Sequence, residues 1–310
     1  MTARASGAGP DVAVTARAPD APRDEPATAS VHAAAAARAD GAPVVASVMR
    51  GRPLRLPSRS LRAARTFAHV LRGLATTTFV FPFVSAERRR ALTQRWSVRL
   101  LRVLRVECRV AGPLALREGN LLLVANHVSW LDIFVLNALH PVRFVAKADI
   151  ARWPVAGRLV RGAGTLFIER ARRRDTHRVN RIVADALAGG DVVAVFPEGT
   201  TSYGDGVLPF KSSLLQPIVD AAGHLQPLAL RYRGHDGAHT TAPSYVGDDP
   251  FIASFWRVCG EARLVVEVVP LAPIEAAGRH RRVLARDAEA AIRGVLTPDA
   301  RATVNPPASG

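Results

Sequence analysis

From residue 111 onward the sequence alternates short apolar runs with longer helical stretches, and this alternation limits the fold more than any other feature. The apolar runs lie at 121–125, 142–146, 165–168, 191–196, 226–232 and 263–269, and helical stretches lie at 150–161, 175–188 and 287–295. Near-continuous apolar strands that alternate with helices are typical of a mainly parallel sheet covered on both faces. We therefore expect an α/β domain over 111–296, followed by a loose Pro/Ala-rich tail at 297–310.

Polar residues follow four successive strands of this predicted sheet. Asn126 and His127 follow the first run, Lys147 the second, Arg170 the third and Glu198 the fourth. In open α/β sheets, ligands bind outside the carboxyl ends of the strands. The sequence therefore predicts one site at this edge of the sheet.

His127 and Asp132 are the strongest candidates for chemistry in that site. Asp132 lies three residues after Ser129, which is the spacing of a helix capping box and gives Asp132 a purely structural alternative. A carboxylate bonded to one ring nitrogen would also fix the tautomer of His127 and stabilise the imidazolium. The positive end of the following helix would help to keep the ring neutral. Both interpretations of Asp132 can hold, because a carboxylate accepts several hydrogen bonds.

No motif supplies a protein nucleophile. The chain has no G-x-S-x-G elbow, and neither Cys108 nor Cys259 lies near a predicted site element. The chemistry expected of His127 is therefore base-assisted attack by a substrate hydroxyl on an activated acyl group, without a covalent enzyme intermediate. With two cysteines and scattered histidines, we expect no metal site and a reducing, cytoplasmic setting.

Four blocks of the sequence carry a family resemblance. Residues 126–132 (NHVSWLD) resemble the N-H-x-S-x-x-D block of glycerolipid acyltransferases of the 1-acyl-glycerol-3-phosphate acyltransferase type. Residues 164–170 (GTLFIER), 196–202 (FPEGTTS) and 225–230 (LQPLAL) resemble the three further blocks, in the family's order. The resemblance covers roughly residues 85–270. It implies an O-acyltransferase of phospholipid biosynthesis.

The resemblance also implies roles for single residues. His127 would deprotonate the acceptor hydroxyl, Asp132 would orient His127, and the hydroxyl would attack the thioester of acyl-CoA or acyl-carrier protein, with no further cofactor. Arg170 would hold an anionic group of the acceptor, for which a guanidinium is well suited. The expected substrate-binding residues are Asn126, Ser129, Lys147, Arg170, Glu198, Gly199, Thr200 and Lys211. The structural alternatives are a solvated basic loop at 170–174 and an ordinary turn at 197–199.

The acceptor has two candidates. The resemblance implies 1-acyl-sn-glycerol-3-phosphate, which would be converted to phosphatidate. The Arg-rich loop at 170–174 and the stretch 242–256 look more like the bacterial subgroup that acylates lyso-ornithine lipid. Because the catalytic pair would be identical, the alternative of lyso-ornithine lipid or another lysolipid stays open.

The N-terminal third has a different composition. Residues 1–60 are rich in Ala, Pro, Gly, Asp and Arg, with few large apolar side chains, which is typical of a disordered segment. The net charge of +16 first suggests nucleic acid. However, residues 61–110 hold eleven Arg against two Glu, interleaved with large apolar residues. This mixture favours a membrane surface as the partner, and not nucleic acid.

Residues 61–110 are accordingly predicted to form membrane-associating helices. The apolar segment 73–84 is too short to span a bilayer core of about 30 Å. Over 87–110 we expect a helix with Leu92, Trp96, Leu100 and Val103 on one face, beside a stripe of arginines. Such a face suits an interfacial helix on anionic lipid, and the alternative is a core helix with a solvated edge. We expect a peripheral or monotopic protein on the cytoplasmic face of the inner membrane.

Overall fold

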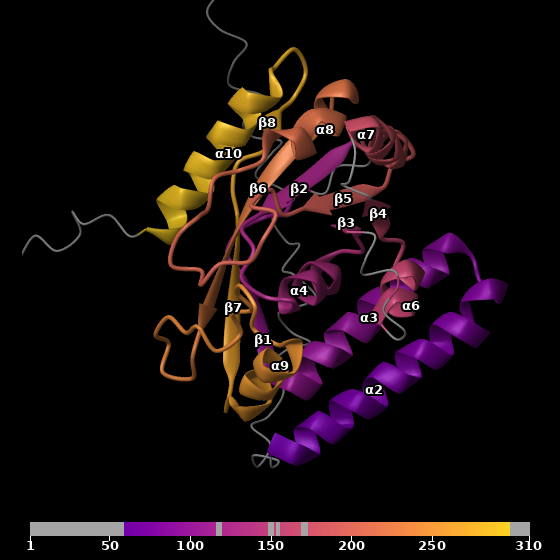
Figure 1. Ribbon diagram of the computed structural model, residues 1–310, viewed down its shortest axis with the longest axis vertical. Helices are drawn as coiled ribbons and strands as arrows, with labels where there is room; N and C mark the ends of the chain where they lie inside the picture. Colours follow the sequence, from indigo (N-terminus) through magenta and orange to yellow (C-terminus); the bar gives the residue numbers. More distant parts are fainter. Residues whose placement is uncertain (1–58, 116–119, 148–151, 153–155, 169–172, 298–310) are drawn as a thin grey trace, which may run out of the picture. The chain divides into compact units, whose positions relative to one another are not determined.

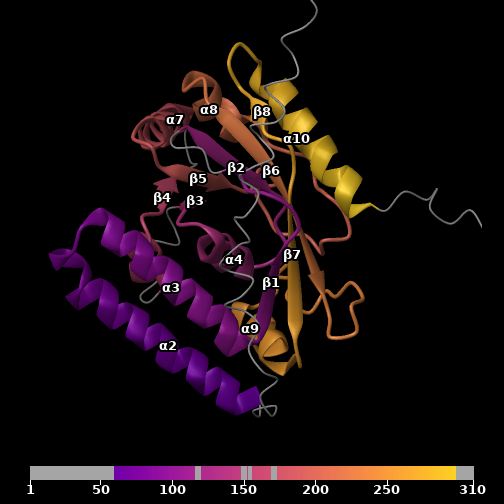
Figure 2. The same cartoon turned by 180° about the vertical axis from the view of Figure 1, so that it is seen from behind.

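The computed structural model describes residues 59–115, 120–147, 152, 156–168 and 173–297, and it has the expected α/β fold (Figures 1 and 2). The strands are β1 (Val106–Val110), β2 (Leu121–Ala125), β3 (Arg143–Lys147), β4 (Leu166–Ile168), β5 (Val192–Val195), β6 (His224–Arg233), β7 (Leu264–Pro270) and β8 (Ile274–Glu275). They form one eight-stranded sheet in the order β1-β7-β6-β2-β5-β3-β4, with β8 paired to β6.

Helices cover both faces of this sheet. They are α2 (Arg59–Phe79), α3 (Ala86–Leu104), α4 (Leu131–Leu139), α6 (Ala156–Gly162), α7 (Arg173–Ala188), α8 (Gln216–Asp220), α9 (Phe251–Gly260) and α10 (Arg281–Leu296), with 3-10 turns η2 (Phe81–Phe83) and η3 (Ser212–Leu215). In Figure 1, α3 and α4 lie on one side of β2, whereas α7, α8 and α10 lie on the other.

The central strand β2 is buried on both faces because its side chains alternate between two cores. Leu121, Leu123 and Ala125 pack into the core that α3 and α4 complete. Leu122 and Val124 pack into the core that α7, α8 and α10 complete. This period-two division explains why the strand reads as a continuous apolar run in the sequence.

The parallel strands bring their carboxyl ends to one edge. β2 pairs in parallel with β5 on one side and with β6 on the other, and β3 pairs in parallel with β5 and β4. Antiparallel pairing enters only where β6 meets β7 and β8, among the strands described. The loops after β2, β3 and β5 therefore start at the same edge, as predicted.

The predicted helix over 87–110 is wrong at its C-terminal end. The helix α3 stops at Leu104, because Arg105 adopts a left-handed conformation with φ of 59°. Residues Val106–Val110 then form β1, which pairs in parallel with β7. Val106 and Cys108 are buried while Arg109 is exposed, and this alternation has the period of a strand.

The apolar face of α3 is turned to the core and not to a membrane. Leu100, Leu101 and Leu104 are buried in the core that contains β2 and α4. Trp96 stacks on His69 of α2, and its ring lies 5.6 Å from that of Phe134. The alternative of a core helix is therefore correct for α3, because α2 covers the face that was expected to meet lipid.

Other differences are smaller. The first two residues of α2, Arg59 and Ser60, fall inside the segment 1–60 that was expected to be disordered, and residues 1–58 and 298–310 lie outside the described residues. The short helix α9, which begins within the segment 242–256 and ends at Gly260, was not predicted. Cys108 and Cys259 are both buried free thiols. Among the described residues, no helix is long and apolar enough to cross a bilayer.

Candidate active site

His127 lies in the loop that joins β2 to α4, and both its backbone N–H and its backbone carbonyl are hydrogen-bonded. Its N–H donates to Glu198 Oε1 at 2.7 Å, and its carbonyl accepts from the N–H of Ser202 at 2.8 Å. Its side chain is 19% exposed, whereas that of Asp132 is completely buried. The imidazole is thus a partly accessible group on a rigid support.

Asp132 contacts His127 directly. His127 Nδ1 lies 2.8 Å from Asp132 Oδ2. Because a carboxylate can only accept, the ring nitrogen that faces it carries the proton, and Nε2 is left with the lone pair. This is the tautomer in which Nε2 can take a proton from a substrate.

The capping interpretation of Asp132 is correct only in part, because the cap residue of α4 is Trp130, and not the predicted Ser129. Oδ2 accepts from the backbone N–H groups of Val128 and Ser129 at 2.8 and 2.9 Å. Ser129 Oγ in turn accepts from the N–H of Leu131 at 3.2 Å, at the start of α4. The short spacing in the sequence therefore lets one carboxylate hold the turn before α4 and contact the histidine.

Asn126 and Ser129 hold the site together from inside the protein. The Asn126 amide donates to the Leu230 carbonyl at 3.0 Å and accepts from the Leu230 N–H at 2.8 Å, which ties the end of β2 to β6. Both side chains are fully buried. The structure gives them a positioning role, and the substrate contact expected of them would require the site to open.

Glu198 is a buried brace. Besides the His127 N–H, it accepts from the N–H of Leu208 at 3.2 Å through Oε2. Burial raises the pKa of the Glu198 carboxyl, an effect larger than the opposing one of its hydrogen bonds from His127 and Leu208. The carboxylate therefore fixes the loop after β2 to the loop after β5.

Gly199 and Lys211 lie side by side next to this brace. Gly199 has φ of +71°, and a Cβ there would lie 2.6 Å from Lys211 Nζ. A residue without a side chain is therefore required if Lys211 is to keep its place. Lys211 and Thr200 are both exposed, and their contact with substrate stays a prediction.

The remaining two predicted residues are described only in part. Lys147 is the last residue of β3, so its backbone lies at the expected edge of the sheet. Arg170 lies outside the described residues. Their binding roles stay predictions.

The chain is similar to known acyltransferases. A family model described as Acyltransferase matches residues 107–231. A 1-acyl-sn-glycerol-3-phosphate acyltransferase of Neisseria gonorrhoeae is 39% identical over 201 residues, which are 64% of this chain and 78% of that protein. A lyso-ornithine lipid O-acyltransferase of Pseudomonas aeruginosa is 38% identical over 242 residues, or 76% of this chain and 92% of that protein. The chain belongs to the acyltransferase family.

The fold of this acyltransferase also has a solved counterpart. A crystal structure of the 1-acyl-sn-glycerophosphate (LPA) acyltransferase, PlsC, from Thermotoga maritima matches it with a TM-score of 0.51 and 21% sequence identity. The match covers 76% of this chain and 96% of that one. At this identity the likeness concerns the fold alone.

Two aromatic side chains of this site, one beside His127 and the other beside Asp132, were not predicted from the sequence. The Phe196 ring, directly after β5, stacks on the His127 ring with centroids 4.0 Å apart and planes 10° apart. Tyr232, on β6, donates its hydroxyl to Asp132 Oδ1 at 2.6 Å. Phe196 is the first residue of the FPEGTTS block, and this position in the sequence could have indicated that it belongs to the site. No local signal marked Tyr232, which lies a hundred residues after Asp132.

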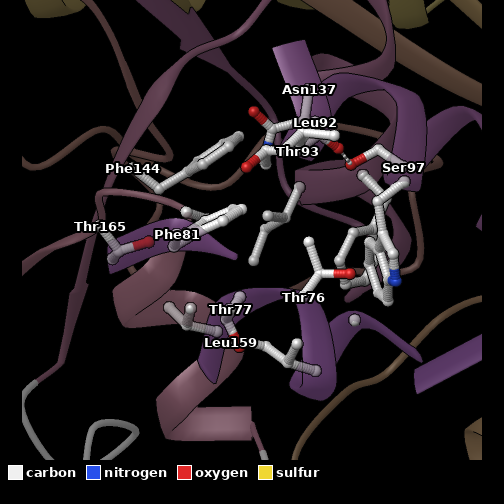
Figure 3. Close-up of a pocket in the computed structure, with 16 residues that line it drawn as sticks. Thr76, Thr77, Phe81, Leu92, Thr93, Ser97, Asn137, Phe144, Leu159 and Thr165 are labelled. Carbon is white, nitrogen blue, oxygen red and sulfur yellow. Dashed lines mark hydrogen bonds between the residues drawn. The ribbon is translucent and has the colours of Figure 1, made fainter. Parts of the chain in front are cut away.

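An apolar cavity of about 130 Å³ lies behind this aromatic layer (Figure 3). Its walls come from α2, η2, α3, α4, β3 and α6, and include Phe81, Leu92, Trp96, Phe134, Phe144 and Leu159. Phe144 also stacks on Phe196, with centroids 6.0 Å apart. A continuous stack of rings therefore leads from the cavity to His127.

Proposed function

We propose that this acyltransferase moves a fatty acyl group from an acyl thioester, either acyl-CoA or acyl-carrier protein, to the free hydroxyl of a lysolipid. The observation that carries the proposal is the 2.8 Å contact of His127 Nδ1 with Asp132 Oδ2, at the carboxyl edge of a parallel sheet. This contact leaves Nε2 unprotonated, as a base on a side chain that is partly exposed. The predicted catalytic roles of His127 and Asp132 are parts of this proposal.

The proton and the leaving group balance in this scheme. His127 Nε2 takes the proton of the acceptor hydroxyl as its oxygen attacks the thioester carbonyl carbon. The C–S bond breaks, the new ester forms, and the thiolate receives the proton from the imidazolium. Asp132 stabilises the imidazolium between the two transfers and stays ionised. The scheme needs no cofactor beyond the acyl donor.

The cavity behind Phe144 suits an acyl chain. Its wall is made almost entirely of apolar side chains and threonines, and it contains no charged residue. Burial of apolar surface is worth about 0.8 kcal/mol per methylene group, so a chain of several carbons gains binding energy here. We propose that this cavity receives part of the acyl group.

The acceptor is either 1-acyl-sn-glycerol-3-phosphate or lyso-ornithine lipid. The first agrees with the relative from Neisseria gonorrhoeae and with a phosphate-binding role for Arg170. The second is favoured by the greater extent of the match to the Pseudomonas aeruginosa protein, which includes 92% of that protein. With either acceptor, Lys147, Arg170 and Lys211 are the cations proposed to meet the anionic part of the head group.

The amphipathic pattern of α2 supports contact with a bilayer. Its buried residues are Arg62, Thr66, His69 and Gly73, which are polar or small. Most of the large apolar side chains of α2 and of the turn after it are exposed instead, although Phe81 is buried; the exposed ones are Leu61, Phe67, Leu71, Phe79, Val80 and Phe83. A helix in water has the opposite pattern. Since Phe83 is 85% exposed, we propose that this face meets lipid.

The helix α9 extends the same apolar surface. Arg62 of α2 donates to the carbonyls of Val258 and Glu261 at the end of α9, so the two helices are joined. α9 exposes Phe251, Ile252 and Trp256. We propose that α2 and α9 lie together on the cytoplasmic face of the inner membrane, where the acyl thioesters are available.

The test is acyl transfer by the purified protein on mixed micelles. Labelled acyl-CoA and acyl-carrier protein are each offered with lysophosphatidate and with lyso-ornithine lipid. The wild type is expected to acylate one of the two lysolipids. His127→Ala should lower kcat by about 10²- to 10⁴-fold, while His235→Ala, in an exposed turn, should not. A wild-type rate in His127→Ala would overturn the mechanism, and no transfer by the wild type to either lysolipid would overturn the function.

A further inference from the structure

Tyr232 provides the contact that completes the environment of Asp132. Its hydroxyl donates to Asp132 Oδ1 at 2.6 Å, from the C-terminal end of β6. Oδ2 already accepts from His127 Nδ1 and from the N–H groups of Val128 and Ser129. Tyr232 is thus the described donor to the carboxylate oxygen that does not face His127.

The hydroxyl is not needed to fill the core. The Tyr232 ring is fully buried in the same cluster as β2, α3 and α4, and a phenylalanine would occupy nearly the same volume. A buried hydroxyl costs free energy unless it finds a partner. Here its partner is the carboxylate of Asp132, so the function of the hydroxyl lies in this one contact.

Tyr232 also stays a donor over the working pH range. Burial, the nearby charge of Asp132 and the hydrogen bond to it raise the pKa of the Tyr232 hydroxyl well above its usual range. A hydroxyl that keeps its proton can donate it to the carboxylate oxygen of Asp132. The interaction is therefore a charge-assisted hydrogen bond, which is short and strong.

We propose that Tyr232 is a positioning residue for acyl transfer, whose hydroxyl holds Asp132 Oδ1 so that Oδ2 stays directed at His127 Nδ1. The inference rests on the proposed function of His127 and Asp132. Without the hydroxyl, Asp132 Oδ1 is buried with one donor fewer, and the carboxylate is free to turn about its Cβ–Cγ bond. His127 then spends less time in the orientation that presents Nε2 to the substrate.

Removing the hydroxyl also concentrates negative charge on Asp132. A hydrogen bond to a carboxylate draws off part of its charge, and the remaining charge stabilises the imidazolium of His127. In Tyr232→Phe both the charge and the orientation of the carboxylate that faces His127 therefore change. The acid limb of the pH profile of kcat should move as a result.

Two other titratable groups of the described residues face this cluster. Glu198 interacts with both His127 and Asp132, and it is unchanged in the variant. Cys108 lies near Tyr232, and burial raises the pKa of its thiol to about 12, so it stays neutral. Neither group would produce a difference between the two profiles.

The experiment compares the wild type with Tyr232→Phe, and uses Tyr203→Phe, which removes an exposed tyrosine hydroxyl, as the matched control. In Tyr232→Phe, kcat should fall about tenfold or more, the effect of losing one hydrogen bond to a charged group. KM should change by less than about twofold, because Tyr232 is buried away from substrate. The control should keep the wild-type kcat and acid limb.

A second comparison separates positioning from a general structural role. If Tyr232 acts through Asp132, then Asp132→Asn with Tyr232→Phe should have nearly the kcat of Asp132→Asn alone. Additive losses, or a lower kcat with an unmoved acid limb, would mean that the hydroxyl only supports folding and would overturn the proposal. An unchanged kcat and profile in Tyr232→Phe would overturn it as well. In all these cases the wild type is still active, so the proposed function is unaffected.

Discussion

Replacing Glu198 with alanine would remove the brace between His127 and Leu208. Glu198 was expected to bind substrate, but its two carboxylate oxygens accept from backbone N–H groups at 2.7 and 3.2 Å, and the residue is buried. A hydrogen bond to a charged group contributes about 1.5 to 3 kcal/mol. Because burial raises the pKa of this carboxyl, part of that gain is offset, and we expect a loss of about 3 kcal/mol for the two bonds together.

The assay is urea unfolding of purified Glu198→Ala, with kcat and KM measured on the folded protein. The free energy of unfolding should fall by about 3 kcal/mol, and kcat should fall because His127 loses its backbone support. Glu198→Gln is the matched control, since its amide oxygen can still accept from His127 while its amide nitrogen faces the Leu208 N–H. We expect it to lose about 1 to 2 kcal/mol. If Glu198→Ala kept the stability and the kcat of the wild type and only its KM rose, the structural role of Glu198 would be refuted. The predicted role in substrate binding would then be supported.

The pH dependence of stability provides a second test of Glu198, in a comparison of the wild type with Glu198→Gln. A carboxyl whose pKa is raised by folding stabilises the fold below its unfolded pKa, and this contribution is lost as the pH rises through the folded pKa. The stability of the wild type should therefore decline relative to Glu198→Gln as the pH rises from the ordinary glutamate range through the raised pKa. A difference that grows in favour of the wild type over this range would contradict the assigned direction.

Two further predictions concern the membrane and the acyl chain. Phe79→Ser with Phe83→Ser should weaken partition onto anionic vesicles about a hundredfold or more, since each buried Phe contributes about 1.5 to 3 kcal/mol, whereas Ile182→Ser, an exposed apolar residue of α7, should not. Equal vesicle binding by both variants in a flotation assay would exclude the α2 face. Ala163→Leu narrows the apolar cavity and should shift the preference for acyl-CoA towards shorter chains in a competition assay. An unchanged preference for acyl-chain length would exclude the cavity as the binding site of the acyl chain.

The fold class and the His127–Asp132 pair could be predicted because both depend on local patterns. Apolar runs such as 121–125 mark strands that are buried on two sides, and that pattern is independent of which strand lies next to which. Asp132 lies five positions after His127, across the turn that begins α4. Over such a distance the backbone of a strand–loop–helix unit fixes the contact almost alone.

Whether the apolar face of a helix meets the core or a lipid surface could not be predicted from local patterns. The face of α3 with Trp96 and Leu100 is amphipathic, and a pattern of this kind fits a core as well as a lipid surface. Only the position of α2, which covers α3 and presents its own apolar residues outward, decided between the two. The end of α3 at Leu104 likewise depends on the pairing of β1 with β7, which is 158 positions away in the register Val106↔Leu264.

The sequence by itself determined the contact between His127 and Asp132, because one turn of chain brings them together. The tertiary structure alone decided what holds them. Tyr232 reaches Asp132 because β6 lies beside β2, and Glu198 reaches His127 because β5 lies on the other side of β2. Strand order and register arise from the packing of two cores over the whole domain, so contacts across the sheet have no signature in the spacing of residues along the chain.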